Sequence, residues 1–195
     1  LARRGATRVL LASLSGHVAR DGQGLEAQLE ALRGTAEVVA SDSADASDTC
    51  ALLCRGHPLS GVLHAAGLGD RGLVLELESA RMAWLMAPKA GGAWHLHCAT
   101  AGMPLEAHVL YSSVGSGLGN VGQGNYATAN ACLDALALSR RAHGEAMCCV
   151  QWPLVGGAGM GAAAFAAQMT MAGFAGISLE QYAACLSARL SEPRG

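Results

Sequence analysis

The 195-residue sequence predicts an α/β fold in which a doubly wound parallel sheet is covered by helices on both faces. Short apolar, β-rich runs alternate with helix-like stretches along the whole chain. The strand candidates are apolar on both faces, as parallel strands buried between two layers of helices should be. In a sheet of this kind ligands bind beyond the carboxyl ends of the strands, so we expect the functional residues there.

Each element of this fold is predicted from its own stretch of sequence. The predicted strands are residues 7–13, 37–42, 61–67, 107–113 and 146–152. The predicted helices are residues 21–33, 43–55, 78–101, 125–143 and 178–190. Gly34 is a natural stop for the first helix, and Ser178 is placed to cap the last. Since no repeat, linker or composition change interrupts the chain, we expect one domain over residues 1–195.

The composition indicates a soluble globular protein. Hydrophobic residues make up 51% of the chain, but no uncharged apolar run approaches the ~20 residues that cross a bilayer. The net charge of -2, without a basic block, gives no reason to expect a nucleic-acid or membrane partner. Seven cysteines, an odd number, favour reduced thiols and a cytoplasmic location. The Cys/His clusters at 50–57 and 95–98 lack a second ligand pair at zinc-like spacing, so no metal is expected.

The glycine-rich stretch GSGLGNVGQGNYATAN (115–130) contains the pattern G-x-G-x-x-G at Gly117, Gly119 and Gly122. A dinucleotide fingerprint opens the first β-α unit, and about 20 residues later an acidic residue ends the next strand. Here the pattern follows the fourth predicted strand, and the residues about 20 positions on end a helix. We therefore interpret the pattern as an incidental match.

The residues around this stretch suggest a different kind of site. Ser113 ends the preceding strand, Tyr126 begins the following helix, and Asn130 lies one helical turn later on the same face. A hydroxyl, a phenol and an amide placed in this way can converge on a small carbonyl group. Ser and Asn are also common near loops, and a Tyr at a helix start can simply pack. On these residues alone, both interpretations stay open.

The segment HVLYSSVGSGLGNVGQGNYATANACLDALALSRRAHG, with GVLHAAG and PKAGGAWHLH before it, resembles the ketoreductase (KR) domain of modular type I polyketide synthases and animal-type fatty acid synthases. Such domains belong to the short-chain dehydrogenase/reductase superfamily, and the resemblance runs from about residue 1 to 190. It implies a Rossmann-like fold. It also implies that the first strand with its phosphate-binding glycine loop, and a last strand, are missing, so that residues 1–195 are a fragment of a larger multidomain synthase.

The resemblance implies a catalytic set of Tyr126, Ser113, Lys89 and Asn130. Tyr126 would protonate the substrate carbonyl oxygen during hydride transfer, and Ser113 would hydrogen-bond the same oxygen. Lys89, the only lysine among 13 basic residues, would favour the tyrosine phenolate by its charge. Asn130 would hold the lysine or a relay water, since this branch of the superfamily has Y-x-x-x-N where most members have Y-x-x-x-K.

The resemblance also implies the cofactor, the substrate and the partners. NADPH would be bound by residues at or just after the carboxyl ends of the first three predicted strands: Ser13, Asp42, Ser43, Ala65, Ala66 and Gly67. Asp42 would lie against the adenine, and the small residues 65–67 along the adenosine ribose. The substrate would be a β-ketoacyl thioester on the phosphopantetheine arm of an acyl carrier protein, with other synthase domains as neighbours.

Departures from the family pattern leave an alternative open. Leu14 stands where an Arg commonly meets the 2′-phosphate of NADPH, and W-P-L-V (152–155) stands where W-G-P-W is usual. Neither marker of the product's configuration is present, because residues 69–71 read Gly-Asp-Arg and position 118 is Leu. The alternative is a catalytically silent KR-like domain that scaffolds a synthase module.

Overall fold

The computed structural model of the protein describes residues 1, 5–17, 24–55, 58–70, 72–119, 121–156 and 175–191. All five predicted strands form, each within three residues of its expected limits. They are β1 (Val9–Ser13), β2 (Ala36–Ala40), β3 (Gly61–His64), β4 (Ala107–Ser113) and β5 (Met147–Trp152). Every pair of neighbouring strands is parallel, which confirms the predicted α/β class.

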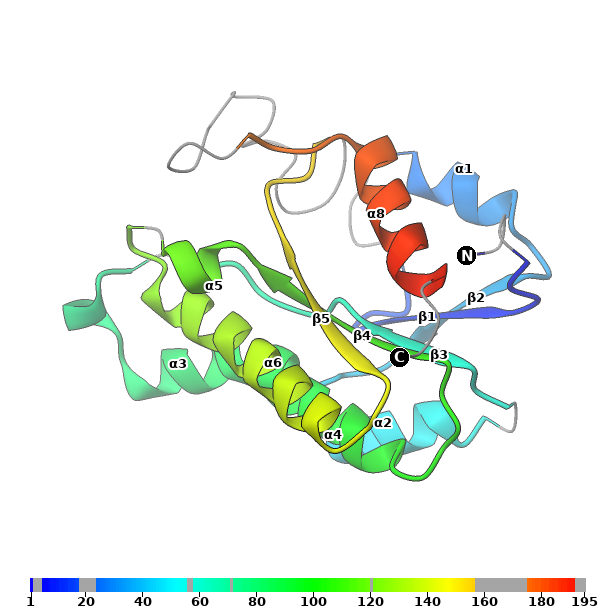
Figure 1. The fold of residues 1–195 in the computed structure, drawn as a ribbon, viewed down its shortest axis with the longest axis horizontal. Helices are drawn as coiled ribbons and strands as arrows, with labels where there is room; N and C mark the ends of the chain where they lie inside the picture. The colour runs from blue at the N-terminus through cyan, green and yellow to red at the C-terminus, as the bar shows by residue number, and fades with distance from the viewer. Residues whose placement is uncertain are drawn as a thin grey trace.

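The strands are divided between two sheets. One holds β1 and β2, and the other has the order β3-β4-β5 (Figure 1). In the larger sheet His64 pairs with Leu110, and Ser113 pairs with Trp152. β4 therefore lies in the middle of the larger sheet, and Ser113 lies at its carboxyl edge.

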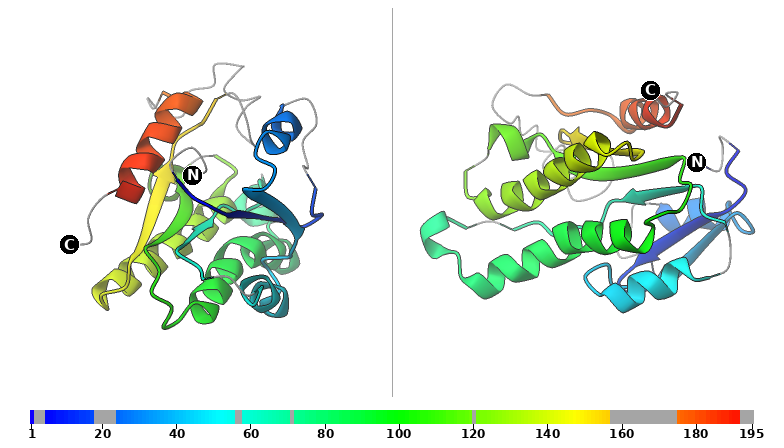
Figure 2. Two further views of the ribbon diagram at one scale, coloured as in Figure 1. Left: turned by 90° about the vertical axis from the view of Figure 1, so that its right-hand side faces the viewer. Right: turned by 60° about the horizontal axis from the view of Figure 1, so that its bottom comes forward.

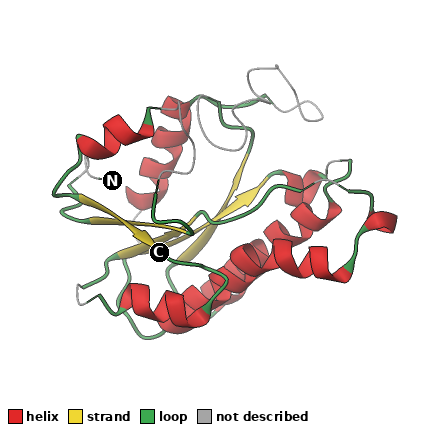
Figure 3. Ribbon diagram, turned by 180° about the vertical axis from the view of Figure 1, so that it is seen from behind, coloured by secondary structure: helices red, strands yellow, loops and turns green. Residues whose placement is uncertain are grey.

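Helices cover both faces of the strands. They are α1 (Leu25–Glu30), α2 (Ala46–Leu53), η2 (Val74–Glu76), α3 (Ser79–Met86), η3 (Ala87–Gly91), α4 (Gly92–Ala99), α5 (Gly115–Leu118), α6 (Gly124–Ala142) and α8 (Leu179–Ser191). Helices α2, α3, α4 and α6 lie on one face, and α1 and α8 on the other (Figures 1 and 2). Figure 3 shows the same layers from behind. No helix in the described ranges is long and apolar enough to span a membrane.

Some helix ends follow the predicted signals and others do not: α1 ends at Glu30, three residues before its predicted limit at residue 33. Gly34 has φ +87° in the turn after α1, a conformation that glycine adopts without strain. Ser178 accepts a hydrogen bond from the Gln181 N–H (3.3 Å), and the Gln181 side chain accepts one from the Ser178 N–H (2.8 Å), so the start of α8 is a capping box. α2 begins at residue 46, later than predicted, because the Asp45 carboxylate caps the N–H groups of Ser47 and Asp48.

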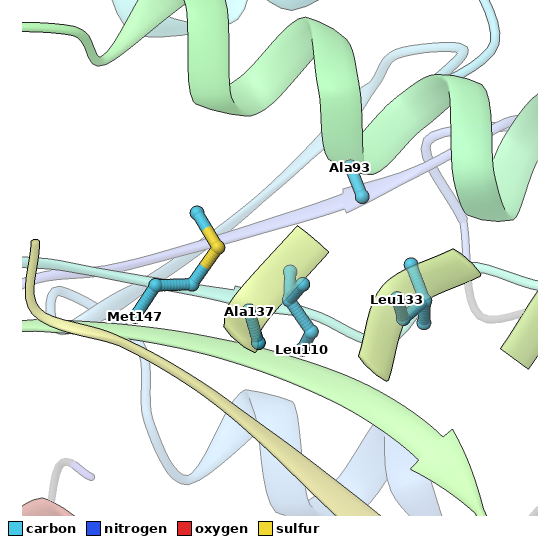
Figure 4. Packing of buried hydrophobic residues seen from close by; sticks show 5 residues of the cluster. All are labelled: Ala93, Leu110, Leu133, Ala137 and Met147. Carbon is cyan, nitrogen blue, oxygen red and sulfur yellow. The ribbon is translucent and has the colours of Figure 1, made fainter. Parts of the chain in front are cut away.

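The apolar core lies between the larger sheet and the α4–α6 layer. Its central cluster joins residues of β4, β5, α4 and α6, as Figure 4 shows: Ala93, Leu110, Leu133, Ala137 and Met147. Leu110 and Leu133 are fully buried. All seven cysteines are free thiols, as predicted. The core therefore fixes the positions of β4 and α6, the two elements that carry Ser113 and Tyr126.

One predicted helix differs from a regular α-helix. The stretch predicted over residues 78–101 forms α3, then the single π-helical turn η3, and then α4. Pro88 lies at the start of this turn, and proline has no N–H for the carbonyl four residues before it. The helix therefore widens at the residues that carry Lys89.

Candidate active site

Three strand ends meet at η3, where Lys89 lies. Ser43, in the turn after β2, donates a hydrogen bond from Oγ to the Pro88 carbonyl (3.1 Å). Gly67, after β3, lies so close that a side-chain Cβ built on it would be 3.1 Å from Lys89 Nζ. Lys89 Nζ itself donates to the carbonyl of Tyr111 on β4 (3.0 Å). The carboxyl ends of β2, β3 and β4 therefore converge on one lysine, as expected for a ligand site in a parallel sheet.

Lys89 is buried, with 4% of its surface exposed. Besides its bond to Tyr111, its Nζ lies over the ring of Tyr126, 5.8 Å from the ring centroid. Burial lowers the pKa of Lys89 to about 8, although Cys149 and Asp134 act in the opposite direction. The ammonium is still the main form at neutral pH, so a positive charge faces the phenol ring.

Tyr126 and Asn130 lie on the first turns of α6. The Tyr126 N–H donates to Asn125 Oδ1 (2.8 Å), and Asn130 Nδ2 donates to the Tyr126 carbonyl (2.8 Å). Asn130 is fully buried, and within the described ranges its Oδ1 has no hydrogen-bond partner. The amide thus contacts the backbone of its own helix, and its predicted bond to the lysine or to a relay water stays a prediction.

Ser113 closes β4 beside the glycine-rich stretch. Its Oγ accepts a hydrogen bond from the Gly115 N–H (3.1 Å) as the chain enters α5. A hydroxyl that accepts in this way keeps its own hydrogen for donation. Gly119 and Gly122 have φ values of +72° and +71°, and they turn the chain from α5 towards α6. The glycines therefore serve the β4–α6 connection, in agreement with our interpretation of the G-x-G-x-x-G pattern.

A polar network beside this site was missed in the sequence. The Asp70 carboxylate accepts from Asn125 Nδ2 (2.6 Å) and from Arg81 Nε (2.7 Å), and Asn125 is fully buried. The Gly72 N–H also donates to the Gly122 carbonyl (2.8 Å). These bonds tie the loop after β3 to the residue next to Tyr126. The usable signal was an amide directly before the tyrosine, since a buried amide needs partners.

The remaining predicted cofactor residues lie at the same strand ends. Ser13 ends β1, and its carbonyl accepts from the Ser41 N–H after β2 (2.9 Å). The Asp42 carboxylate accepts from the Ala44 N–H (2.9 Å), which shapes the turn that holds Ser43. Gly67, the last of residues 65–67, lies beside the lysine. These strand ends are where we expect an extended nucleotide to cross from β1 and β2 to β3, and one residue departs from that expectation. Leu14 is 74% exposed and brings no charge to the β1 end.

Comparison with known proteins identifies the family to which the chain is similar. The family model of the KR domain matches residues 1–157. The chain is 45% identical over 153 residues to the polyketide synthase GfsB of Streptomyces halstedii, covering 77% of this chain and 3% of that protein. It is 38% identical over 205 residues to the spectinabilin polyketide synthase system protein NorB of Streptomyces orinoci, covering 100% and 9%. A solved A1-type ketoreductase superposes with a TM-score of 0.87 at 34% identity, covering 97% of this chain and 41% of that one.

These matches and the geometry of the candidate site support the same family. The chain spans less than a tenth of the two synthases, and it superposes on ketoreductase structures across nearly its whole length. The chain therefore belongs to the ketoreductase (KR) domain family of type I polyketide synthases, within the short-chain dehydrogenase/reductase superfamily.

Proposed function

We propose that residues 1–195 are part of a ketoreductase domain in a larger, cytoplasmic synthase, and that this domain reduces a carrier-bound β-ketoacyl thioester to the β-hydroxyacyl thioester with NADPH. The observation that carries this proposal is the buried Lys89 ammonium, which bonds to the Tyr111 carbonyl and faces the ring of Tyr126. Burying a cation costs free energy unless the charge is paired or hydrogen-bonded, so a buried lysine with a lowered pKa is a candidate for function. A phenol beside such a cation is suited to proton transfer. The family of the chain supports the same reaction class.

Each of the four residues has a role in this reaction. Bound NADPH supplies the hydride that adds to the β-carbon of the substrate. Tyr126 gives its phenolic proton to the carbonyl oxygen as negative charge develops there, and Ser113 donates its hydroxyl hydrogen to the same oxygen. The Lys89 ammonium stabilises the phenolate that Tyr126 becomes.

Asn130 then helps to restore the proton of Tyr126 by holding a water molecule. Its Oδ1 is a buried acceptor without a partner in the described part of the chain, and a water needs such an acceptor to be held beside α6. That water would reprotonate Tyr126 after each turnover. The amide nitrogen is already used by the Tyr126 carbonyl, which keeps the Oδ1 orientation fixed.

The nucleotide is held at the strand ends. Ser13, Asp42 and Ser43 would meet its adenosine end, and residues 65–67 would allow it to pass close to the backbone. The acyl substrate would arrive on the phosphopantetheine arm of an acyl carrier protein. That partner, and neighbouring synthase domains, are part of the proposal because the relatives are large synthases.

The proposal is tested with the full-length protein, NADPH and a β-ketoacyl thioester, by following the absorbance of NADPH. We expect Tyr126→Phe to lower kcat by about a hundredfold or more, because the proton donor is lost. Tyr182→Phe is the matched control, since its hydroxyl bonds to the Tyr111 hydroxyl on the α8 side of the sheet (3.0 Å). A folded protein that neither binds nor oxidises NADPH would instead support the silent scaffold. Full activity in Tyr126→Phe would show that the proton donor is another group.

A further inference from the structure

The turn that carries Lys89 is held by side chains from outside its own helix. In η3 the Gly92 N–H is directed to the carbonyls of Ala87 and Lys89, and Pro88 contributes no N–H. Single π turns of this kind are rare, and many occur at functional sites. The carbonyls of such a turn can accept hydrogen bonds from donors outside the helix, and the Lys89 carbonyl has a second lone pair besides the one that faces the Gly92 N–H.

Two such donors are present. Ser43 Oγ donates to the Pro88 carbonyl (3.1 Å), and His64 Nε2 lies 2.9 Å from the Lys89 carbonyl. Since a carbonyl oxygen can only accept, His64 carries a hydrogen on Nε2. His64 ends β3 and is 3% exposed. Burial lowers the pKa of His64 and outweighs the hydrogen bond to the Lys89 carbonyl, which raises it, so the ring is neutral when it donates.

Gly92, directly after η3, makes room for both donors. A Cβ at this position would lie 3.0 Å from His64 Cε1 and 3.0 Å from the Ser43 carbonyl oxygen. Contacts that short require the histidine or the serine loop to move. The glycine, the serine and the histidine thus form one packed arrangement against η3.

We infer that His64 is a positioning residue for the active-site lysine, because it binds the Lys89 carbonyl and so fixes the turn from which Nζ reaches the Tyr111 carbonyl and the Tyr126 ring. Its effect on catalysis rests on the proposed function. Its effect on the surroundings of Lys89 does not, because the contact belongs to the protein alone. Cys149 and Asp134 raise the pKa of Lys89, and none of the substitutions below changes them. His64 also interacts with the charge of Lys89, but its ring is neutral at the pH of the comparison.

The first experiment measures the pKa of Lys89 in the full-length protein. Acetylation by acetic anhydride is followed over a pH series, and mass spectrometry of the peptide that contains Lys89 gives its reactivity. Three variants are compared with the unchanged protein. His64→Met removes the donor and keeps the volume, His64→Gln keeps an amide donor, and His108→Met changes a second buried histidine, 3% exposed, whose Nε2 has no partner within the described ranges.

We expect a pKa near 8 for Lys89 in the unchanged protein, in His64→Gln and in His108→Met. In His64→Met the turn relaxes and the lysine gains water, so its pKa should rise by at least about one pH unit towards the ordinary lysine value. The inference is wrong if His64→Met and His108→Met give the same pKa as the unchanged protein. If His64→Met does not fold, Gly92→Ala replaces it. Its Cβ displaces the His64 ring, and an unshifted pKa in that folded variant would overturn the inference equally.

The second experiment measures kinetics in the same variants. His64→Met should lower kcat by roughly ten- to a hundredfold, as expected for a reacting group displaced by about 1 Å, while the KM for NADPH stays within about twofold. His64→Gln should recover most of kcat. If no variant, including the unchanged protein, reduces a thioester, but the Lys89 pKa shifts as expected, the proposed function fails and the positioning role stands.

Discussion

The two sheets of the protein differ in how deeply the side chains of their strands are buried. The β3-β4-β5 sheet contains the fully buried Leu110 and packs against the core cluster. In the β1–β2 sheet only Val39 is buried, and no residue of β1 is. The β1–β2 sheet, here called the outer sheet, instead carries two ion pairs on its surface, in which Arg8 and Arg55 both pair with Glu37.

The proposed site also has a more buried part, around Lys89 and Asn130, and a more exposed part, where the nucleotide would bind. Lys89 and Asn130, the catalytic candidates nearest the core, are 4% and 0% exposed. Ser13 and Asp42, the candidates at the nucleotide end, are half-buried, and so are Ser113 and Tyr126. We infer that the surroundings of Lys89 and Asn130 tolerate little change, whereas the nucleotide end can vary, as Leu14 illustrates.

The largest effect is expected at Lys89, in the buried part of the site. Lys89→Met should lower kcat by about 10²- to 10⁴-fold, because the phenolate of Tyr126 loses its neighbouring charge. Steady-state kinetics with NADPH and a β-ketoacyl thioester measure this. A variant that keeps more than a third of the activity would show that the lysine is not part of the chemistry.

The same substitution should not destabilise the protein at neutral pH. The folded-state pKa of Lys89, about 8, is below the unfolded-state value, so the unfolded chain binds more protons between pH 8 and 10.5. The free energy of unfolding should therefore rise across this window by up to about 3 kcal/mol, and the cost of burying the charge is fully present below pH 8. Urea unfolding at pH 7.5 and 10.5 should show this rise in the unchanged protein and a smaller one in Lys89→Met. Equal pH dependence in both would contradict the burial of the charge.

A matched pair of leucines compares the cores of the two sheets. Leu110→Ala, at a fully buried position on β4, should lower the free energy of unfolding by about 2–5 kcal/mol. Leu11→Ala, at a position on β1 that is 38% exposed, should lower it by less than about 1.5 kcal/mol. Urea unfolding of both variants measures the difference. Equal losses would mean that the outer sheet is as firmly packed as the inner one.

The nucleotide end should respond to added charge. Leu14→Arg places a guanidinium at the exposed end of β1, where it can pair with the 2′-phosphate of NADPH. We expect the ratio of kcat/KM for NADPH over NADH to rise by about tenfold, with kcat unchanged. Leu14→Gln is the uncharged control, and an equal rise in that variant would exclude a charge effect.

The smallest effect is expected at the surface ion pairs. The hydrogen bond from Arg8 is the main cause of a lowered pKa for the Glu37 carboxyl, and desolvation acts in the opposite direction. Because the group is solvated, Glu37→Gln should change the midpoint of urea unfolding only slightly, and the change should disappear in high salt. A large, salt-independent loss would show that these pairs organise the outer sheet.

Much of the fold could be predicted because its signals are local. Runs that are apolar on both faces located the five strands, and Ser178 set the start of α8 correctly, whereas α1 ends at Glu30, before the limit that Gly34 predicted. The π turn could not be predicted from periodicity, because one extra residue in a single turn hardly disturbs an apolar pattern. Pro88 was the available sign, since a proline inside a helical stretch removes one hydrogen bond. The division into two sheets also has no local signal, because strand pairing is set by distant residues.

The candidate site was predicted from residue types together with the family resemblance. A single lysine, and a tyrosine one turn before an asparagine, are visible in the sequence, but the resemblance assigned them to one site. The supporting contacts of His64 and Asn125 are not, because they depend on which backbone carbonyl or carboxylate the fold brings near. The Asn130 amide shows the same limit, since its Nδ2 bonds to the helix backbone that carries it.

The most direct test of the proposed reaction follows the hydride itself. The full-length protein is incubated with a β-ketoacyl thioester and NADPH that carries two deuterium atoms at C4 of the nicotinamide, and the product is analysed by mass spectrometry. We expect one deuterium at the β-carbon of a β-hydroxyacyl thioester, and no such product from Tyr126→Phe above about one hundredth of the normal rate. Unchanged thioester from the folded, NADPH-bound protein, or equal product from Tyr126→Phe, would contradict the proposed function.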